Sequence, residues 1–505
     1  MTALDAIRPL LLTDGYKTGH RRQYPTGTTR VLSNFTNRGS RLPGVDHVIH
    51  FGLQAAVGEL LIDAFAPFFS AGEDEVADAY QQAMDAYLGP GAVDVDHIRE
   101  LHRLGHLPLR IRALPEGSRV PLQVPVFTIE NTDDRFAWLT NYVESALSAA
   151  YWHPSTTATI ADRFRTVLEA AALRTTGSTA GVEFQGHDFS FRGQTSIASA
   201  EASGAGHLTA FRGTDSLPAL WWIEKHYPGS TEPIAASVPA TEHSVMMAGG
   251  RDHEDETYAR LLRDYPAGIL SVVSDTWDLW RVITETLPRL KDEIMARDGR
   301  LVIRPDSGNP ADILCGTGEV GGTNEPSAAE DAADDTAGDP AEKGVIELLW
   351  EIFGGTLTPQ GFKVLDPHIG AIYGDSITLE RMTDIIARLE AKGFASTNVV
   401  FGIGSFTYQY QTRDTFASAI KATWAQIDGE GRDLIKDPVT DNGTKKSATG
   451  RLAVTRDESG EFVLIERAAP EEEAGSALAP IFVDGRLTVV DSFDAVRQRI
   501  AAGRP

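Results

Sequence analysis

The sequence predicts an α/β fold whose central part is a (β/α) barrel, and three observations support this prediction. From about residue 181 onward, short apolar runs alternate with helical segments. Repeated strand–loop–helix units predict parallel strands joined by right-handed crossovers. The number of units favours a barrel over a short open sheet. Polar residues follow the apolar runs, as catalytic groups do at the carboxyl ends of barrel strands.

The part of the chain before these units is predicted to mix short strands with helices. Apolar patterning and flanking turn residues indicate strands over 30–37, 107–114 and 122–133. A long helical stretch begins near residue 135 and is expected to close near Pro154. An amphipathic helix follows over 159–177 and is expected to stop at Gly177.

The barrel units then follow in order. Strand-like runs are predicted over 181–193, 208–215, 268–275, 300–310, 368–375 and 398–405. The helical segments that alternate with them are 195–208, 216–227, 276–294 and 376–393. Near the C-terminus, a β-hairpin is predicted around residues 457–461.

Composition restricts the class of protein. The 505 residues, 42% of them hydrophobic, are enough for one large or two medium domains with a full core. A formal net charge of −25 disfavours nucleic-acid binding, because the phosphate backbone repels such a surface. Small anionic ligands remain compatible with this charge wherever Arg, Lys and backbone N–H groups cluster locally.

The sequence also predicts the compartment. Cys315 is the only cysteine, which excludes an intrachain disulfide and a cysteine-based zinc site. No apolar run reaches the roughly 18 residues that span a membrane, and the N-terminus lacks the marks of a signal peptide. We therefore expect a cytoplasmic protein with no membrane or nucleic-acid partner.

Residues 316–344 differ from their surroundings. The segment is acidic, rich in Gly and Ala, and of low complexity. Such a composition cannot bury a core, so a flexible surface insertion is expected. The sequence assigns it no role.

The residues at the ends of the apolar runs are candidates for a single site. They are Asp188, Asp215, Asp275, Arg304 with Asp306, Asp375 and Gly404. At the carboxyl ends of barrel strands, these groups would lie on one face. The alternative for each Asp is a helix N-cap or a turn residue.

The chemistry of these runs suits a phosphorylated sugar and a flat ring. Phe189 offers a stacking face, and Arg192 a guanidinium that can bind phosphate through two hydrogen bonds. In "IRPDSGNP" (303–310), Arg304 and Asp306 flank a proline, which preorganises the loop. The Gly-x-Gly of "FGIGS" (401–405) offers backbone N–H groups, although it is not a full nucleotide-binding fingerprint.

Several motifs together resemble those of the nicotinamide phosphoribosyltransferases. They run in family order from residue 13 to about residue 451: "TDGYKTGHRRQYP" (13–25), "GHDFSFRG" (186–193), "FRGTD" (211–215), "SVPATEHS" (237–244), "SVVSD" (271–275), "IRPDSGNP" (303–310), "IYGD" (372–375) and "KDPV" (436–439). The combination of "IRPDSGNP" with "VPATEHS" is the most specific part of the resemblance.

The resemblance implies an activity and an architecture. The family condenses nicotinamide with 5-phosphoribosyl 1-pyrophosphate, giving nicotinamide mononucleotide and pyrophosphate, with Mg²⁺ as cofactor and ATP as a stimulating co-substrate. It implies a modified (β/α) barrel over 151–406 and a mainly β domain built from 1–150 and 407–505. It also implies a homodimer whose subunits share their active sites.

For the nicotinamide ring, the resemblance implies the following roles. Phe189 matches the aromatic residue that stacks under the ring, and Tyr16 the aromatic residue that closes the sandwich from the other subunit. Asp215 matches the carboxylate that holds the carboxamide. A carboxylate there accepts from an amide NH₂ and repels the carboxylate of nicotinate, so it predicts a preference for nicotinamide.

For the phosphorylated groups, the resemblance implies a larger set. His243 matches the histidine that ATP transiently phosphorylates, and Glu242 and Asp275 are expected to orient that imidazole. Asp306 and Asp275 are expected near Mg²⁺, through water. The remaining expected substrate contacts are Arg192, Arg304, Gly374, Asp375, Gly404, Ser405, and, from the partner subunit, Arg413 and Lys421.

One departure and two alternatives accompany this interpretation. Where the family often has a longer glycine run, this chain has Ser405 and Phe406 after Gly404. The first alternative is a nicotinate phosphoribosyltransferase, against which Asp215 argues. The second is a non-catalytic relative that binds the mononucleotide, against which His243, Asp275, Arg304 and Asp306 argue.

Overall fold

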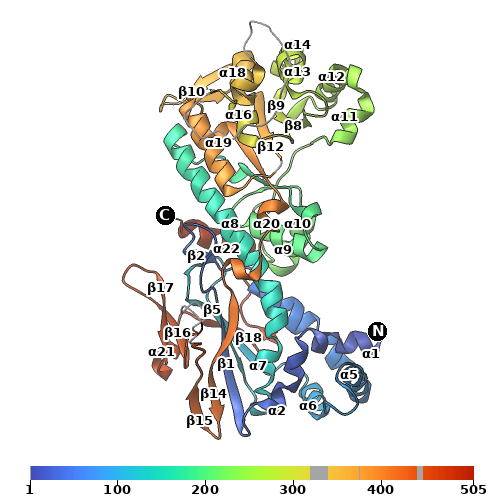
Figure 1. The fold of residues 1–505 in the computed structure, drawn as a ribbon, viewed down its shortest axis with the longest axis vertical. Coiled ribbons are helices and arrows are strands. Elements are labelled where there is room, and N and C mark those ends of the chain that lie inside the picture. Colours follow the sequence, from blue (N-terminus) through green and yellow to red (C-terminus); the bar gives the residue numbers. More distant parts are fainter. Residues whose placement is uncertain (1, 319–338, 375, 439, 441–446, 505) are drawn as a thin grey trace. The chain divides into compact units, whose positions relative to one another are not determined.

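The computed structural model describes residues 2–318, 339–374, 376–438, 440 and 447–504. The chain divides into two compact units, whose elements Figure 1 labels. Unit 1 comprises Met1–Thr159, Ala219–Glu232 and Gln411–Pro505, and unit 2 comprises Ile160–Pro218 and Pro233–Tyr410. The boundaries expected after residues 150 and 406 therefore fall a few residues too early.

Unit 2 contains a six-stranded sheet in the order β7-β6-β13-β12-β9-β8. All neighbouring strands in it are parallel. The strands are β6 (Gly186–Asp188), β7 (Gly213–Thr214), β8 (Ala267–Val273), β9 (Asp298–Arg304), β12 (Ile369–Tyr373) and β13 (Val399–Ile403). The predicted class, an α/β fold with a parallel barrel-like sheet, is confirmed.

The segment 236–241 closes this sheet into a ring. Ala236 forms a parallel bridge with Gly213 of β7, and Ala240 forms one with Ser271 of β8. Because β7 and β8 are the two edge strands of the six-stranded order, one irregular segment pairs with both edges. Sequence reasoning did not recognise this segment as part of the barrel wall, because it is short and contains Pro239, which a strand interior disfavours.

Helices and short turns connect the parallel strands. Between β6 and β9 they are α9 (Ile197–Leu208), α10 (Leu217–His226), α11 (His243–Gly249), α12 (Glu254–Asp264), α13 (Leu279–Arg281), η8 (Val282–Thr286), α14 (Leu287–Arg289) and α15 (Lys291–Met295). After β9 they are α16 (Pro310–Cys315), α17 (Pro340–Lys343), α18 (Val345–Phe353), α19 (Leu379–Ala391) and α20 (Ser405–Tyr408), with the small hairpin of β10 (Gly355–Leu357) and β11 (Lys363–Leu365). The predicted alternation of strand and helix is present.

Unit 1 is organised around a seven-stranded sheet in the order β15-β14-β1-β5-β3-β18-β19. Its strands come from both ends of the chain: β1 (Thr28–Thr36), β3 (Leu109–Ala113), β5 (Pro125–Asn131), β14 (Ala419–Ile427), β15 (Glu430–Asp433), β18 (Ala479–Val483) and β19 (Arg486–Leu487). All pairs in it are antiparallel. The strands predicted over 30–37, 107–114 and 122–133 are β1, β3 and β5.

Two further hairpins and several helices complete unit 1. The C-terminal hairpin predicted around residues 457–461 is β16 (Leu452–Arg456) paired with β17 (Phe462–Glu466). The other hairpin pairs β2 (His47–Ile49) with β4 (Arg119–Pro121). The helices include α1 (Ala3–Ile7), α2 (His20–Gln23), α5 (Glu73–Leu88), α6 (Asp96–Leu104), α7 (Leu139–Tyr142), α21 (Pro470–Ala474) and α22 (Phe493–Ala502). Phe35, Phe127 and Tyr151 form a ring cluster in the core, with centroids 4.7–5.3 Å apart.

The expected helix break at Pro154 does not occur. Helix α8 (Glu144–Thr176) continues through Pro154 and ends before Gly177, the predicted stop, which adopts a left-handed conformation at φ 74°. Contacts with the segment around β2 surround the proline: Ser155 Oγ donates to Ile49 O at 2.7 Å, and Gly52 approaches the proline ring. A proline removes one backbone hydrogen bond from a helix, and here tertiary contacts beside Pro154 hold the helix against the segment around β2.

The placement of residues 219–232 in unit 1 also corrects an expectation, which put them in the barrel domain. His226 Nε2 lies 2.8 Å from Glu59 Oε1, and Tyr227 Oη donates to Glu116 Oε2 at 2.6 Å. Gln54 donates to the backbone oxygen of His226. These buried polar contacts hold the end of α10 in unit 1.

One helical stretch, Leu53–Ser70, is long and apolar enough to cross a membrane by length and composition, whereas none was expected. It comprises α3 (Leu53–Val57), η3 (Gly58–Asp63) and α4 (Ala66–Ser70). Its residues Leu53, Leu61 and Phe68 are buried in the core of unit 1. Core packing accounts for its apolar character.

The two ends of the expected insertion lie together. Thr317 N donates to Ala341 O at 2.9 Å, next to α17. Residues 319–338, which carry most of the acidic sequence, lie outside the described residues.

Candidate active site

The predicted site residues follow the carboxyl ends of adjacent parallel strands in unit 2. Phe189 follows β6, Asp215 follows β7, Asp275 follows β8, Asp306 follows β9, Gly374 follows β12 and Gly404 follows β13. Because parallel strands end at the same edge of a sheet, these residues share one rim of the barrel. Asp375, also expected here, lies outside the described residues.

Asp188 differs from its neighbours on this rim. Its side chain is fully buried. Oδ1 accepts from Ser190 N at 2.9 Å, and Oδ2 accepts from Thr214 Oγ1 at 3.3 Å. With both oxygens occupied by the protein, Asp188 has the structural turn role that was the alternative for each Asp.

Asp275 connects His243 to the loop after β9. Its Oδ1 lies 3.3 Å from His243 Nε2. Its Oδ2 accepts from the backbone N–H of Asp306 at 3.0 Å and from Ser307 Oγ at 2.6 Å. The Asp275 side chain is only 7% exposed, whereas that of His243 is 41% exposed. One buried carboxylate therefore orients an accessible imidazole and holds Asp306 in place.

His243 begins helix α11, directly after the segment that closes the barrel. Thr241 fixes the end of that segment to β8, because its N donates to Ser271 O and its Oγ1 accepts from Val273 N, both at 3.0 Å. The expected contact between Glu242 and His243 is not among the hydrogen bonds of the described residues. Instead, Glu242 Oε1 accepts from Ser244 Oγ.

Arg304 is the most buried cation of the rim. One of its terminal nitrogens donates to Thr241 O at 2.6 Å, and its buried Nε has no partner in the described part of the chain. Burial lowers the pKa of Arg304, although the nearby carboxylates of Asp306, Asp215 and Asp275 oppose this shift. Arg192 is exposed on the short helix η6 (Phe191–Gly193) and lies close enough to repel Arg304.

Among the described residues, only one oxygen of the Asp215 carboxylate is hydrogen-bonded to the protein. His187 Nε2 lies 3.0 Å from its Oδ1, and Ser237 Oγ donates to the same oxygen at 2.6 Å. Burial raises the pKa of this carboxyl, but the hydrogen bonds from His187 and Ser237 and the charge of Arg304 outweigh burial and lower it. Asp215 is therefore an anion at neutral pH.

Phe189 is positioned by β13 and by His187. Its N–H donates to Ile403 O at 3.0 Å. Its ring lies over Gly402, where an added Cβ would come 2.6 Å from Phe189 Cδ2. The His187 and Phe189 rings are 4.7 Å apart at an angle of 44°.

Two glycines give the rim its close contacts. A Cβ at Gly374 would lie 2.6 Å from Asp306 Oδ1, and a Cβ at Gly193 would overlap the side chain of Ser405. Gly404 caps α20, and nothing lies within 4 Å of its missing side chain. Ser405, the first residue of α20, thus packs against the loop that carries Arg192.

The other predicted residues lie in unit 1. Tyr16 is 65% exposed and packs beside His20 at 5.3 Å between ring centroids. Arg413 is exposed and pairs with Asp414 at 3.0 Å. Lys421 is half-buried on β14 and donates to its neighbour's backbone oxygen, Ile420 O, at 2.9 Å.

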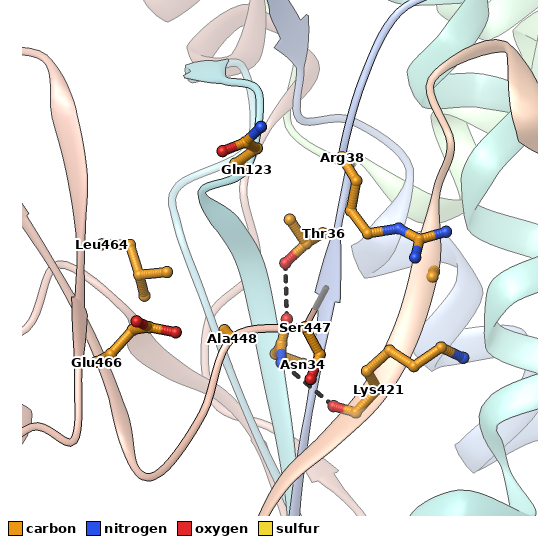
Figure 2. Close-up of a pocket in the computed structure, with 10 residues that line it drawn as sticks. Asn34, Thr36, Arg38, Gln123, Lys421, Ser447, Ala448, Leu464 and Glu466 are labelled. Carbon is orange, nitrogen blue, oxygen red and sulfur yellow. Dashed lines mark hydrogen bonds between the residues drawn. The ribbon is translucent and has the colours of Figure 1, made fainter. Parts of the chain in front are cut away.

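Lys421 lines a pocket of about 280 Å³ in unit 1 (Figure 2). Figure 2 shows the ends of Arg38 and Lys421 on one side of this pocket, and Leu464 and Glu466 on the other. Asn34 Nδ2 donates to Lys421 O at 3.2 Å, which ties β1 to β14 at the pocket.

Positive charges gather around Lys421. Burial and the charges of Arg38, Lys436 and Arg413 lower its pKa, and Glu144 opposes them. Cations packed this closely repel one another, and an anion placed among them would relieve that repulsion.

Sequence reasoning missed four residues of these two regions: His187, Ser237, Ser307 and Arg38. The first three lie inside motifs that were quoted for other residues, so the signal was present but assigned to their neighbours. Arg38 follows β1 without a motif, and only the fold brings it beside Lys421.

The comparison with family models identifies the class. The model of the nicotinate phosphoribosyltransferase (NAPRTase) family matches residues 184–469, more than half of the chain. The chain therefore belongs to the nicotinate phosphoribosyltransferase family. The model of the nicotinamide phosphoribosyltransferase N-terminal domain matches residues 9–89.

Full-length relatives narrow the class to the nicotinamide phosphoribosyltransferases. The chain is 50% identical to a nicotinamide phosphoribosyltransferase of Acinetobacter baylyi, covering 98% of this chain and 97% of the relative. It is 34% identical to a nicotinamide phosphoribosyltransferase of Xanthomonas campestris pv. campestris, covering 98% of each. The resemblance drawn from the motifs is confirmed.

Solved structures support the fold. A nicotinate-nucleotide pyrophosphorylase from Pyrococcus furiosus matches with a TM-score of 0.58 at 15% identity, covering 99% of this chain and 95% of that one. Human nicotinic acid phosphoribosyltransferase matches with a TM-score of 0.53 at 16% identity, covering 97% and 93%. At this identity the likeness concerns the fold alone.

Proposed function

We propose that this chain condenses nicotinamide with 5-phosphoribosyl 1-pyrophosphate to form nicotinamide mononucleotide and pyrophosphate, as in NAD salvage. The observation that carries the proposal is the rim itself. It combines an aromatic face at Phe189, an anionic carboxylate at Asp215 and a half-buried cation at Arg304. The full-length relatives with this name support it.

The carboxylate of Asp215 selects the base. The nicotinamide ring stacks on Phe189, and the amide NH₂ donates to Asp215. The carboxylate of nicotinate would instead meet a like charge, which is why we favour nicotinamide over the alternative substrate.

The reaction depends on how the two substrates are positioned and needs no general base to remove a proton. The ring nitrogen's electron pair attacks C1′ of the ribose, the C1′–O bond breaks, and its electrons leave with pyrophosphate. No proton moves in this step. Positive charge develops on the ribose, and a nearby carboxylate such as Asp306 stabilises it. Arg304 and Arg192, with the backbone N–H groups near Gly404 and Ser405, hold the phosphates.

The rim fits a magnesium ion that the substrate brings. In such sites one or two carboxylates, water and substrate phosphates hold Mg²⁺, and a bound ion would supply positive charge beside the leaving pyrophosphate. Among the described residues no cluster of three or more His, Cys, Asp or Glu side chains could hold a metal. Both oxygens of Asp275 are occupied by protein groups. Asp306 and Asp275 would therefore serve the ion through water.

His243 is the group that we propose ATP phosphorylates. A carboxylate only accepts hydrogen bonds, so Asp275 selects the tautomer with hydrogen on Nε2 and leaves the electron pair on Nδ1. Nδ1 attacks the γ-phosphorus, and the bond to ADP breaks. Water later cleaves the N–P bond, which couples ATP hydrolysis to synthesis.

We also propose a homodimer with shared sites, in the cytoplasm. Tyr16, Arg413 and Lys421 lie in unit 1, and the proposal is that they reach the barrel rim of a second copy. The positive charges around Lys421 support a phosphate-binding role for this region. Analytical ultracentrifugation tests the dimer.

The test of the function is mononucleotide formation from phosphoribosyl pyrophosphate and Mg²⁺, with nicotinamide and nicotinate in parallel, with and without ATP. We expect product from nicotinamide, stimulation by ATP, and loss of that stimulation in His243→Ala. A preference for nicotinate would favour the nicotinate enzyme. Binding of the mononucleotide without turnover of either base would favour a non-catalytic relative.

A further inference from the structure

We propose that His187 and Ser237 are positioning residues that set the preference for nicotinamide over nicotinate, by fixing Asp215 so that one of its oxygens is committed to the protein and the other to the substrate. This inference rests on the proposed function and concerns residues to which that function assigns no role.

Both protein contacts of Asp215 fall on a single oxygen. His187 Nε2 lies 3.0 Å from Oδ1, and Ser237 Oγ lies 2.6 Å from it. In the described part of the chain, no hydrogen bond reaches Oδ2. The Asp215 side chain is 44% exposed, so this second oxygen is accessible from the rim.

The two donors lie on the two segments of the barrel wall that flank β7, the strand that Asp215 follows. His187 lies on β6, next to β7, and Ser237 lies on the segment that bridges β7 and β8. Held from both sides, the carboxylate cannot turn about its own axis without losing a hydrogen bond. Oδ2 is therefore presented in one orientation before substrate arrives, and such preorganisation strengthens recognition.

His187 contacts both groups that would bind the base. Besides its bond to Asp215, its ring packs against Phe189. Space for the ring depends on Gly213, where an added Cβ would come 2.7 Å from His187 Nδ1. One imidazole thus sets the spacing between the stacking face and the acceptor of the amide.

These contacts also keep Asp215 charged. Burial favours its neutral form, and the hydrogen bonds from His187 and Ser237 oppose burial. Without them, a protonated Asp215 could donate to the carboxylate of nicotinate, and discrimination between the two bases would fall. A purely structural histidine on β6 predicts something different, namely an equal loss with both bases.

The experiment compares kcat and KM for nicotinamide and for nicotinate in the wild type and in His187→Phe, which keeps an aromatic ring but removes the donor. We expect kcat/KM for nicotinamide to fall by about 30-fold, mainly through KM, because a hydrogen bond to a charged group is lost. With nicotinate, kcat/KM should stay the same or rise.

Three further variants separate positioning from folding. Ser237→Ala leaves the ring intact and should lower the nicotinamide-to-nicotinate ratio by about 5-fold. His187→Gln retains a donor near the position of Nε2 and should restore part of the ratio. His253→Phe, on an exposed histidine of the same unit, should leave the ratio unchanged.

The outcomes separate this inference from the proposed function. Equal losses with both bases in His187→Phe and Ser237→Ala would overturn the inference and leave the function standing. If the wild type turned over neither base, the function would fail. The Kd ratio of the two bases, measured by calorimetry in the same variants, would still decide the role of His187.

Discussion

The interior of unit 2 and its rim each contain a histidine, and the two differ in one respect. His207, fully buried, uses both ring nitrogens: Nδ1 lies 2.7 Å from Tyr408 Oη and Nε2 lies 2.9 Å from Gly213 O. His243, on the rim, uses Nε2 with Asp275, and within the described residues its Nδ1 has no partner. His207 is fully partnered, as buried polar groups usually are, whereas His243 keeps Nδ1 for the phosphate that we propose it accepts.

Carboxylates of the two units show the same difference. Glu116 in unit 1 is buried, and its oxygens accept from Gln54 N at 2.6 Å, Gly52 N at 2.9 Å and Tyr227 Oη at 2.6 Å. Asp215 on the rim uses one oxygen only. In these two pairs, the fully partnered group holds the fold, and the partly partnered group keeps an atom that faces the rim.

The largest effect is expected where one rim carboxylate supports several groups. Asp275→Ala removes the anchor of His243, the Asp306 backbone and Ser307 together. We expect kcat/KM for nicotinamide to fall by about 100-fold or more, because hydrogen bonds to a charged group are lost. Steady-state kinetics measure this.

Asp278→Ala is the matched control. Asp278 lies in the same loop but caps α13 through Arg281 N. Its loss should change kcat/KM by no more than about twofold, since a cap contributes stability rather than chemistry. If Asp278→Ala and Asp275→Ala were equally impaired, the loop as a whole, and not the carboxylate, would matter.

The fully partnered histidine should matter for stability. His207→Leu removes the hydrogen bonds to Tyr408 Oη and Gly213 O in the buried interior, so the free energy of unfolding should fall by about 3 kcal/mol. Urea denaturation measures it, with His253→Leu as an exposed control. A loss below about 1 kcal/mol would mean that burial, and not hydrogen bonding, sets the role of His207.

Glu116 and Asp215 should respond to pH in opposite directions. Burial raises the pKa of Glu116 from 4.5 to about 7, against the hydrogen bonds that it accepts. The folded state therefore retains a proton that the unfolded state releases. The contribution of Glu116 to stability is fully present at and below pH 4.5 and decreases by roughly 3 kcal/mol as the pH rises from 4.5 to about 7.

Asp215, whose pKa is lowered, contributes above pH 3.8, and its contribution is lost as the pH falls below that value. The measurement is the unfolding free energy of the wild type minus that of Glu116→Gln between pH 4.5 and 8, with the same difference for Asp215→Asn below pH 5. If both stability differences changed with pH in the same direction, Glu116 and Asp215 would not have oppositely shifted pKa values.

Sequence reasoning predicted the rim well because its signals are local. When a polar residue such as Asp215 or Asp306 directly follows an apolar strand, its sequence position alone places it at the carboxyl end of that strand. The family motifs added His243, which local pattern alone would have assigned to a helix start.

What the sequence could not show depends on contacts between distant segments. Helix α8 continues through Pro154 because Gly52 and Ile49, a hundred residues earlier, pack against it. The barrel is closed by residues 236–241, whose pairing is defined only by the two edge strands. Which oxygen of Asp215 is open likewise depends on His187 and Ser237 together.

The smallest of these effects concerns the space beside the rim carboxylates. Gly374→Ala would place a Cβ 2.6 Å from Asp306 Oδ1. Asp306 cannot move freely, because its backbone N–H is held by Asp275 and Tyr373 Oη donates to the backbone oxygens of Ser307 and Gly308, each at 2.9 Å. The carboxylate must therefore rotate away from the place that we propose for the ribose, and we expect kcat/KM to fall by about 10-fold, with kcat affected more than KM for nicotinamide. Gly39→Ala, where nothing lies within 4 Å of the missing side chain, should have no effect. If Gly374→Ala were as active as Gly39→Ala, the loop after β9 would be able to yield, and the rim would depend less on a fixed Asp306 than its partnering indicates.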